Sequence, residues 1–210
     1  MFERLEPILA NALARFEQQD PGTIDQSSYV MTLALLGFGY EFLGKWQAAL
    51  EFYSRGLQLD PYNDALLVAR GVLLYGTSPR AIADLETALR TGSPLIWPYV
   101  FLAHHYLLNG RFEECRKLCE RALGMKGSPA VMSEVSEWTA IAQAELGFPA
   151  EVVRGSFDNA IRIDPSNARA KRNLAAFEAA NPPITDKIWE TRSTGAVRTS
   201  GLAERRYHNP

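Results

Sequence analysis

Two cysteines and two histidines near the middle of the chain are the residues best suited to chemistry. Cys115 and Cys119 lie four residues apart, and His104 and His105 shortly precede them. Thiolate and imidazole groups are good zinc ligands, so this set could hold a metal ion. On a helix, however, a spacing of four places both cysteines on one face, which equally suits two buried thiols.

No other pattern in the sequence predicts catalysis. It contains no phosphate-cradling glycine-rich loop, no nucleophile elbow, no HExxH helix and no paired-acid signature. His104 and His105 have no nucleophile or carboxylate partner at a defined spacing. We therefore predict that the protein is not an enzyme.

Composition narrows the class of partner. The 210 residues carry a formal net charge of -2, and 47% of them are hydrophobic. A substantial core is therefore expected, with no bulk attraction to nucleic acid or anionic lipid. An export signal needs basic residues followed by an uninterrupted apolar stretch, and this chain instead has Glu3, Arg4 and Glu6 near its start. Two cysteines four residues apart on one helix are poorly placed for an unstrained disulfide. We expect a protein partner and a cytoplasmic location.

One segment requires a membrane test. Residues 91–110 include no Asp, Glu, Lys or Arg over a length that could cross a bilayer. Pro94, Pro98 and Asn109 interrupt its apolar character. We predict a buried helix there and no membrane span.

Paired helices recur along the chain. Leu33, Leu36 and Tyr40 fall on one face of a predicted helix that Gly44 ends, and a second apolar series runs from there to Asp60. The same order recurs three more times. The steps between equivalent small residues are 34, 32 and 37 residues, measured at Gly37, Gly71, Ala103 and Ala140.

This arrangement resembles the tetratricopeptide repeat, a helix-turn-helix unit of 34 residues. The first repeat matches best, through its LLGFGY, GKW, AALEFY and LDP elements. The resemblance implies an all-α fold, a right-handed superhelical solenoid of stacked hairpins. We expect an amphipathic N-terminal helix over 1–20, four repeats within 30–165 (about 30–63, 64–95, 96–129 and 133–167), a capping helix over 166–180, and an extended or disordered tail over 181–210. In the capping helix, Leu174 and Phe177 should face inward and Arg169 should face solvent.

The repeat pattern also predicts the environment of the two cysteines. Cys115 and Cys119 occupy the positions that Ala49 and Tyr53 hold in the first repeat, which are core positions. We therefore predict buried thiols, no metal site and no cofactor.

In this family the first helices of successive pairs line a concave surface that receives the partner. On each of these helices, the residues one position along the chain from the packed apolar residues lie about 100° further around the helix. These are the side chains that would face the concave surface. Such an apolar groove suits an amphipathic helix or a hydrophobic segment, and packing between neighbouring repeats is the alternative for each side chain. The predicted groove residues are Phe38, Phe42, Val68, Val72, Tyr75, Trp97, Val100, His104, Leu108 and Ile141.

One branch of the family grips the terminal carboxylate of a chaperone tail with Lys, Arg and Asn at these positions. Ala34, Phe38, Val68 and Val72 stand there in this chain. We therefore predict no carboxylate clamp and no binding of chaperone tails.

The tail over 181–210 has a loop-like composition, yet it carries Ile188 and Trp189. An exposed tryptophan favours a partner surface. Three possibilities remain open: the tail folds back into the groove, it orders on a partner, or it stays solvated.

Together these patterns predict a non-catalytic scaffold or adaptor, such as an assembly factor for a larger complex. The alternative is a constitutive structural subunit of a complex, with its tail ordered on a partner. The sequence does not indicate which protein is bound.

Overall fold

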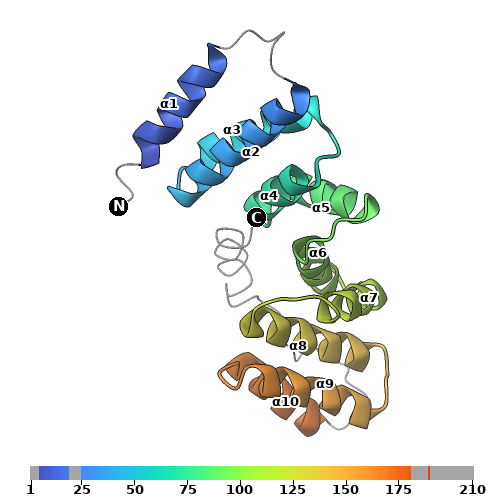
Figure 1. Cartoon of the computed structure of the whole chain (residues 1–210). Coiled ribbons are helices and arrows are strands. Elements are labelled where there is room, and N and C mark those ends of the chain that lie inside the picture. Colours follow the sequence, from blue (N-terminus) through green and yellow to red (C-terminus); the bar gives the residue numbers. More distant parts are fainter. Residues whose placement is uncertain (1–4, 19–24, 181–188, 190–210) are drawn as a thin grey trace. The chain divides into compact units, whose positions relative to one another are not determined.

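The computed structural model describes residues 5–18, 25–180 and 189, and these contain ten α-helices and no strand (Figure 1). The predicted all-α repeat fold is confirmed. The chain divides into two compact units, residues 1–93 and 94–210, here called the N-terminal and C-terminal units. The helices are α1 (Leu5–Glu17), α2 (Gln26–Phe42), α3 (Trp46–Leu59), α4 (Asp64–Leu74), α5 (Arg80–Arg90), α6 (Trp97–Leu108), α7 (Phe112–Leu123), α8 (Pro129–Glu145), α9 (Ala150–Ile163) and α10 (Ala168–Ala180).

The N-terminal unit consists of two helix hairpins and one additional helix. α2 packs against α3 and α4 against α5, and the hairpins join where α3 contacts α4. Buried Leu33, Leu36 and Phe52 form a core cluster between α2 and α3, and Leu9 and Leu13 of α1 pack against it. The amphipathic helix α1 therefore covers an apolar face of the first hairpin.

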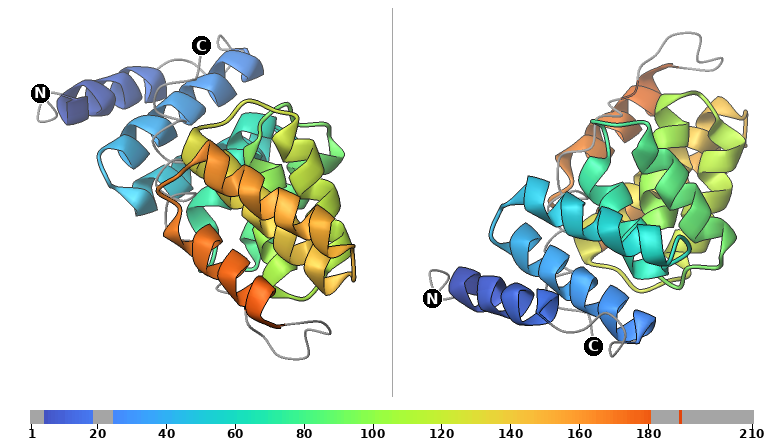
Figure 2. Two further views of the ribbon diagram at one scale, coloured as in Figure 1. Left: turned by 90° about the horizontal axis from the view of Figure 1, so that it is seen from below. Right: turned by 90° about the horizontal axis from the view of Figure 1, so that it is seen from above.

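The C-terminal unit repeats this plan and ends in a single helix. α6 pairs with α7 and α8 with α9, and α7 contacts α8. α9 and α10, drawn in orange to red in Figure 2, lie side by side. The uncharged segment noted in the sequence supplies α6, in which eight residues are buried. None of the described helices is both long and apolar enough to cross a bilayer.

Short-range signals explain where several helices begin and end. The Asp25 carboxylate accepts a hydrogen bond from the Ser28 backbone N–H at 3.0 Å, and the Asn63 amide oxygen accepts one from Leu66 N–H at 3.2 Å. These caps satisfy backbone donors that the first turn leaves unpaired. Gly44 and Gly147, with φ of 74° and 76°, follow α2 and α8 in the left-handed conformation that glycine adopts without strain.

Glycines allow the two helices of a hairpin to approach closely. A β-carbon added at Gly37 would lie 2.6 Å from Cδ1 of Tyr53, and one added at Gly71 would lie 2.8 Å from Cγ of Leu85. Both partner side chains are fully buried. The large residue of one helix thus fills the space above the glycine of the other, as the repeat pattern predicts.

Polar contacts attach α10 to the C-terminal unit. Glu137 of α8 is fully buried and accepts hydrogen bonds from Arg169 at 2.8 Å and from Asn173 at 2.7 Å. Arg169 also lies 3.6 Å from the buried Glu134. The sequence pattern placed Arg169 on the solvated face of a capping helix, and that prediction is wrong: only 3% of Arg169 is exposed, because it neutralises carboxylates of α8.

Replacing Gly37 by alanine tests the close approach within the first hairpin. The added methyl group would force Tyr53 to move, so we expect Gly37→Ala to lower the free energy of unfolding by about 2 kcal/mol. Urea denaturation followed by circular dichroism measures this change. Gly155→Ala is the control, because nothing lies within 4 Å of its β-carbon and alanine favours a helix. Equal stability of Gly37→Ala and the wild type would contradict the packing argument.

Candidate interaction surfaces

An exposed apolar stripe runs along α2 in the N-terminal unit. It consists of Met31, Leu35, Phe38 and Phe42, whose spacings of four, three and four residues place them on one helix face. Met31 is 62% exposed and Leu35 is 60% exposed, and the two phenylalanines are half-buried. Phe38 is held by an edge-on contact with Tyr53, with ring centroids 5.5 Å apart. Phe38 and Phe42 were predicted from the sequence, whereas Met31 and Leu35 were not.

The predicted groove residues of α4 have a different environment. Val68 and Val72 are buried with 0% and 1% exposure. Tyr75 is half-buried, and burial raises the pKa of its phenol. For the two valines, the structure favours packing over a role in an open groove.

In the C-terminal unit, most predicted groove residues are also in the core. Trp97, Val100 and Ile141 are buried. His104 is 7% exposed, and its ring lies 4.9 Å from the ring of Trp138. Leu108, at 50% exposure, remains available to a partner.

Trp189 of the tail contacts its own C-terminal unit. Its ring lies 6.0 Å from that of Phe157 in α9 and 6.4 Å from that of Phe177 in α10. Its indole N–H donates a hydrogen bond to a carboxylate oxygen of Glu145, near the end of α8. Trp189 therefore joins an aromatic cluster at α9 and α10. Ile188, the other residue predicted to make tail contacts, lies outside the described residues.

The two cysteines are buried in α7. Their sulfur atoms lie 3.9 Å apart, and both thiols are free. The hydrogen bond between them, together with burial, raises the pKa of the Cys115 thiol, so the thiolate that a metal or an electrophile would require is disfavoured. Within the described ranges, no group of three or more His, Cys, Asp or Glu side chains is placed to hold a metal ion.

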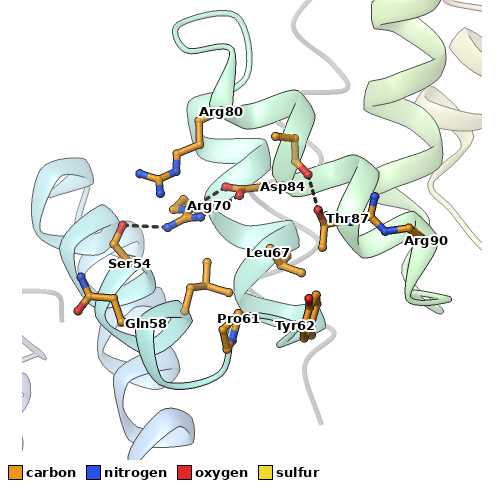
Figure 3. Close-up of a pocket in the computed structure, with 12 residues that line it drawn as sticks. Ser54, Gln58, Pro61, Tyr62, Leu67, Arg70, Arg80, Asp84, Thr87 and Arg90 are labelled. Carbon is orange, nitrogen blue, oxygen red and sulfur yellow. Dashed lines mark hydrogen bonds and ion pairs between the residues drawn. The ribbon is translucent and has the colours of Figure 1, made fainter.

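The N-terminal unit also contains a polar pocket that the sequence analysis did not predict (Figure 3). It has a volume of about 550 Å³ and lies between α3 and α5, beside the start of α4. Arg70 forms one wall: it donates to both carboxylate oxygens of Asp84, at 2.7 and 2.8 Å, and to Ser54 at 3.3 Å. The lining residues are Ser54, Leu57, Gln58, Pro61, Tyr62, Leu67, Arg70, Arg80, Ala83, Asp84, Thr87 and Arg90.

Comparisons with known proteins identify the fold. No protein-family model and no curated protein matches the sequence. Among solved structures, the chain is similar to YrrB, described as a TPR protein with an unusual peptide-binding site, at 17% identity and a TM-score of 0.63 over 85% of this chain and 86% of that one. It is also similar to a structure of the MamA protein, at 14% identity and a TM-score of 0.62 over 88% and 98% of the two chains. The chain has the tetratricopeptide-repeat fold.

The tetratricopeptide-repeat fold gives each surface a place in the repeat. The α2 stripe and Leu108 belong to first helices of hairpins. The polar pocket lies mainly on α3 and α5, which are second helices. The two surfaces therefore use different helices of the same unit.

Breaking the Arg70–Asp84 pair should destabilise the N-terminal unit. Both side chains are over nine-tenths buried, so Arg70→Ala would leave a buried carboxylate without its partner. We expect a loss of about 3 kcal/mol in the free energy of unfolding. The double replacement Arg70→Met with Asp84→Leu should lose much less, because it removes both charges. Denaturation curves that show the same loss for both variants would contradict this account.

Removing Trp189 should loosen α10. We expect Trp189→Ala to speed amide hydrogen exchange in α10 about tenfold, because its contacts with Phe157 and Phe177 hold that helix to α9. Trp46→Ala, a change at an exposed tryptophan in the N-terminal unit, should leave exchange in α10 unaltered. Unchanged exchange in both variants would mean that the tail contact does not stabilise α10.

Proposed function

We propose that the protein is a non-catalytic interaction scaffold, and that the α2 stripe binds the apolar face of an amphipathic helix from a partner protein. The observation that carries this proposal is the exposure of Met31 and Leu35, each about three-fifths accessible on a helix whose remaining apolar residues pack inward. Contiguous exposed apolar side chains on a soluble fold favour a binding surface.

The dimensions and chemistry of the stripe suit a helix. From residue 31 to residue 42 the helix axis rises by about 16 Å, or three turns, which matches apolar residues at positions i, i+4, i+7 and i+11 of a partner helix. Phe38 and Phe42 are half-buried, so they lose little side-chain freedom on binding and suit the role of anchors. Met31 is unbranched and can adapt to the shape of the partner.

The charge around the stripe also supports an apolar ligand. α2 has no basic residue in its last turn and no acidic residue in its first turn, and its one described internal acid, Glu41, is buried and accepts a hydrogen bond from the Tyr53 hydroxyl at 2.6 Å. The described part of α2 thus offers no charged side chain to hold a terminal carboxylate. YrrB, which shares the fold, is described as having a peptide-binding site, and this supports a peptide-like ligand here.

Charge insertion on the stripe tests the proposal. Met31 and Leu35 are exposed, so Met31→Glu with Leu35→Glu should leave the fold intact while placing two carboxylates against the apolar partner. We expect capture of the partner from native lysate, quantified by mass spectrometry, to fall at least tenfold. Titration calorimetry with the recovered partner segment should then show a similar loss of affinity.

Ile8→Glu is the matched control, because Ile8 is 61% exposed in the same unit but lies on α1. It should capture the same partner as the wild type. Equal recovery by the wild type and the stripe variant, with both folded by circular dichroism, would rule out the α2 stripe as the binding surface.

A further inference from the structure

We propose that the polar pocket between α3 and α5 is a second binding site, which takes an extended acidic segment of a protein. Three arginines line it, Arg70, Arg80 and Arg90, against one acid, Asp84. Asp84 is neutralised by the two hydrogen bonds from Arg70. The pocket therefore carries a net positive charge, in a chain whose formal net charge is -2.

The two remaining arginines are available to a ligand. Among the described residues, neither Arg80 nor Arg90 forms an ion pair, and both are exposed. Arg90 donates a hydrogen bond to the Thr87 hydroxyl at 3.2 Å, which holds its guanidinium at the rim. A guanidinium without a carboxylate partner is a strong donor for an incoming one.

The spacing of these arginines indicates the shape of the ligand. Arg80 and Arg90 are ten residues apart on α5, so their Cα atoms are separated by about 15 Å along the helix axis. In Figure 3 their side chains lie apart, on either side of the Arg70–Asp84 pair. An extended peptide rises about 3.3 Å per residue, so two carboxylates four or five residues apart would reach both guanidiniums.

The floor of the pocket suits a peptide backbone. The exposed Gln58 amide can pair with both the N–H and the C=O groups of a peptide. The Ser54 hydroxyl accepts from Arg70 and can still donate to a peptide C=O, whereas the Thr87 hydroxyl already donates to the Ala83 carbonyl and can only accept. Tyr62 at the edge is 67% exposed and offers a ring for side-chain contact. None of these residues belongs to the α2 stripe. An experiment that contradicts one of the two proposed sites therefore leaves the other proposal standing.

A titration of the full chain with a defined probe tests the site. The probe is an unstructured glycine-serine peptide carrying two glutamates four residues apart, and the readout is the shift of backbone amide signals in a heteronuclear NMR spectrum. We expect shifts concentrated at pocket residues, including Gln58 and Thr87. Arg80→Gln with Arg90→Gln should weaken binding about tenfold, as expected for the loss of two partly exposed ion pairs.

Matched controls separate specific binding from general charge attraction. Arg15→Gln with Arg121→Gln removes two other exposed arginines and should change affinity less than twofold. The same peptide with glutamines in place of its glutamates should not bind. Ala83→Glu, which leaves all arginines in place but adds a carboxylate to the lining, should weaken binding as strongly as the double arginine variant.

Several outcomes would overturn the proposal. They are an absence of shifts at the pocket, equal binding by the double arginine variant, and equal losses in the Arg15 and Arg121 control. The last experiment is a competition titration with inorganic phosphate. If phosphate binds the pocket more tightly than the peptide and displaces the peptide, the site recognises a single anion and not an acidic segment.

Discussion

Close approach of the two helices in each hairpin is the constraint on which the rest of the N-terminal unit depends. Gly37 admits the Tyr53 ring and Gly71 admits the Leu85 side chain, so each hairpin has one tightly defined spacing. That spacing fixes which face of α2 and of α5 points away from the core. The α2 stripe and the lining of the polar pocket are both consequences of it. The surfaces on which function is proposed are therefore positioned by packing that contains no functional residue.

Much of this architecture could be predicted because it follows from local patterns. A few residues of sequence are enough to show the helical spacing of apolar residues, turn glycines such as Gly44 and helix-capping residues such as Asn63. The groove residues were harder to predict. Choosing the residues next to the packed face works only where a helix is covered on one face alone. α4 has only eleven residues and buries seven of them, including Val68 and Val72. A short helix that packs on several sides has few residues left for a groove.

Polar residues were the least predictable part. Arg70 and Asp84 are 14 residues apart and Glu137 and Arg169 are 32 apart, so no helical period relates them. One signal was present for the pocket: Arg70 is the only charged residue in ALLVARGVLL (residues 65–74), where an unpaired charge would be costly. In the fourth repeat, Ser136 and Gln143 stand at the positions that Leu33 and Tyr40 hold in the first repeat. Ser136 donates to the Ser156 carbonyl, and Gln143 accepts from the Ser156 hydroxyl, so these residues join α8 to α9 by hydrogen bonds.

The buried Glu137–Arg169 contact also limits how this array can be shortened or lengthened. Each hairpin in a repeat array contacts mainly its neighbours, so hairpins can in principle be added or deleted as modules. Here a hairpin cannot simply be deleted or inserted after α9, because Glu137 and Glu134 of α8 pair with Arg169 of α10. A fragment cut after α9, or a foreign repeat spliced in at that point, would lose the arginine that pairs with both carboxylates. The smallest self-sufficient form of the C-terminal unit therefore includes α10, and any repeat grafted there must bring its own arginine.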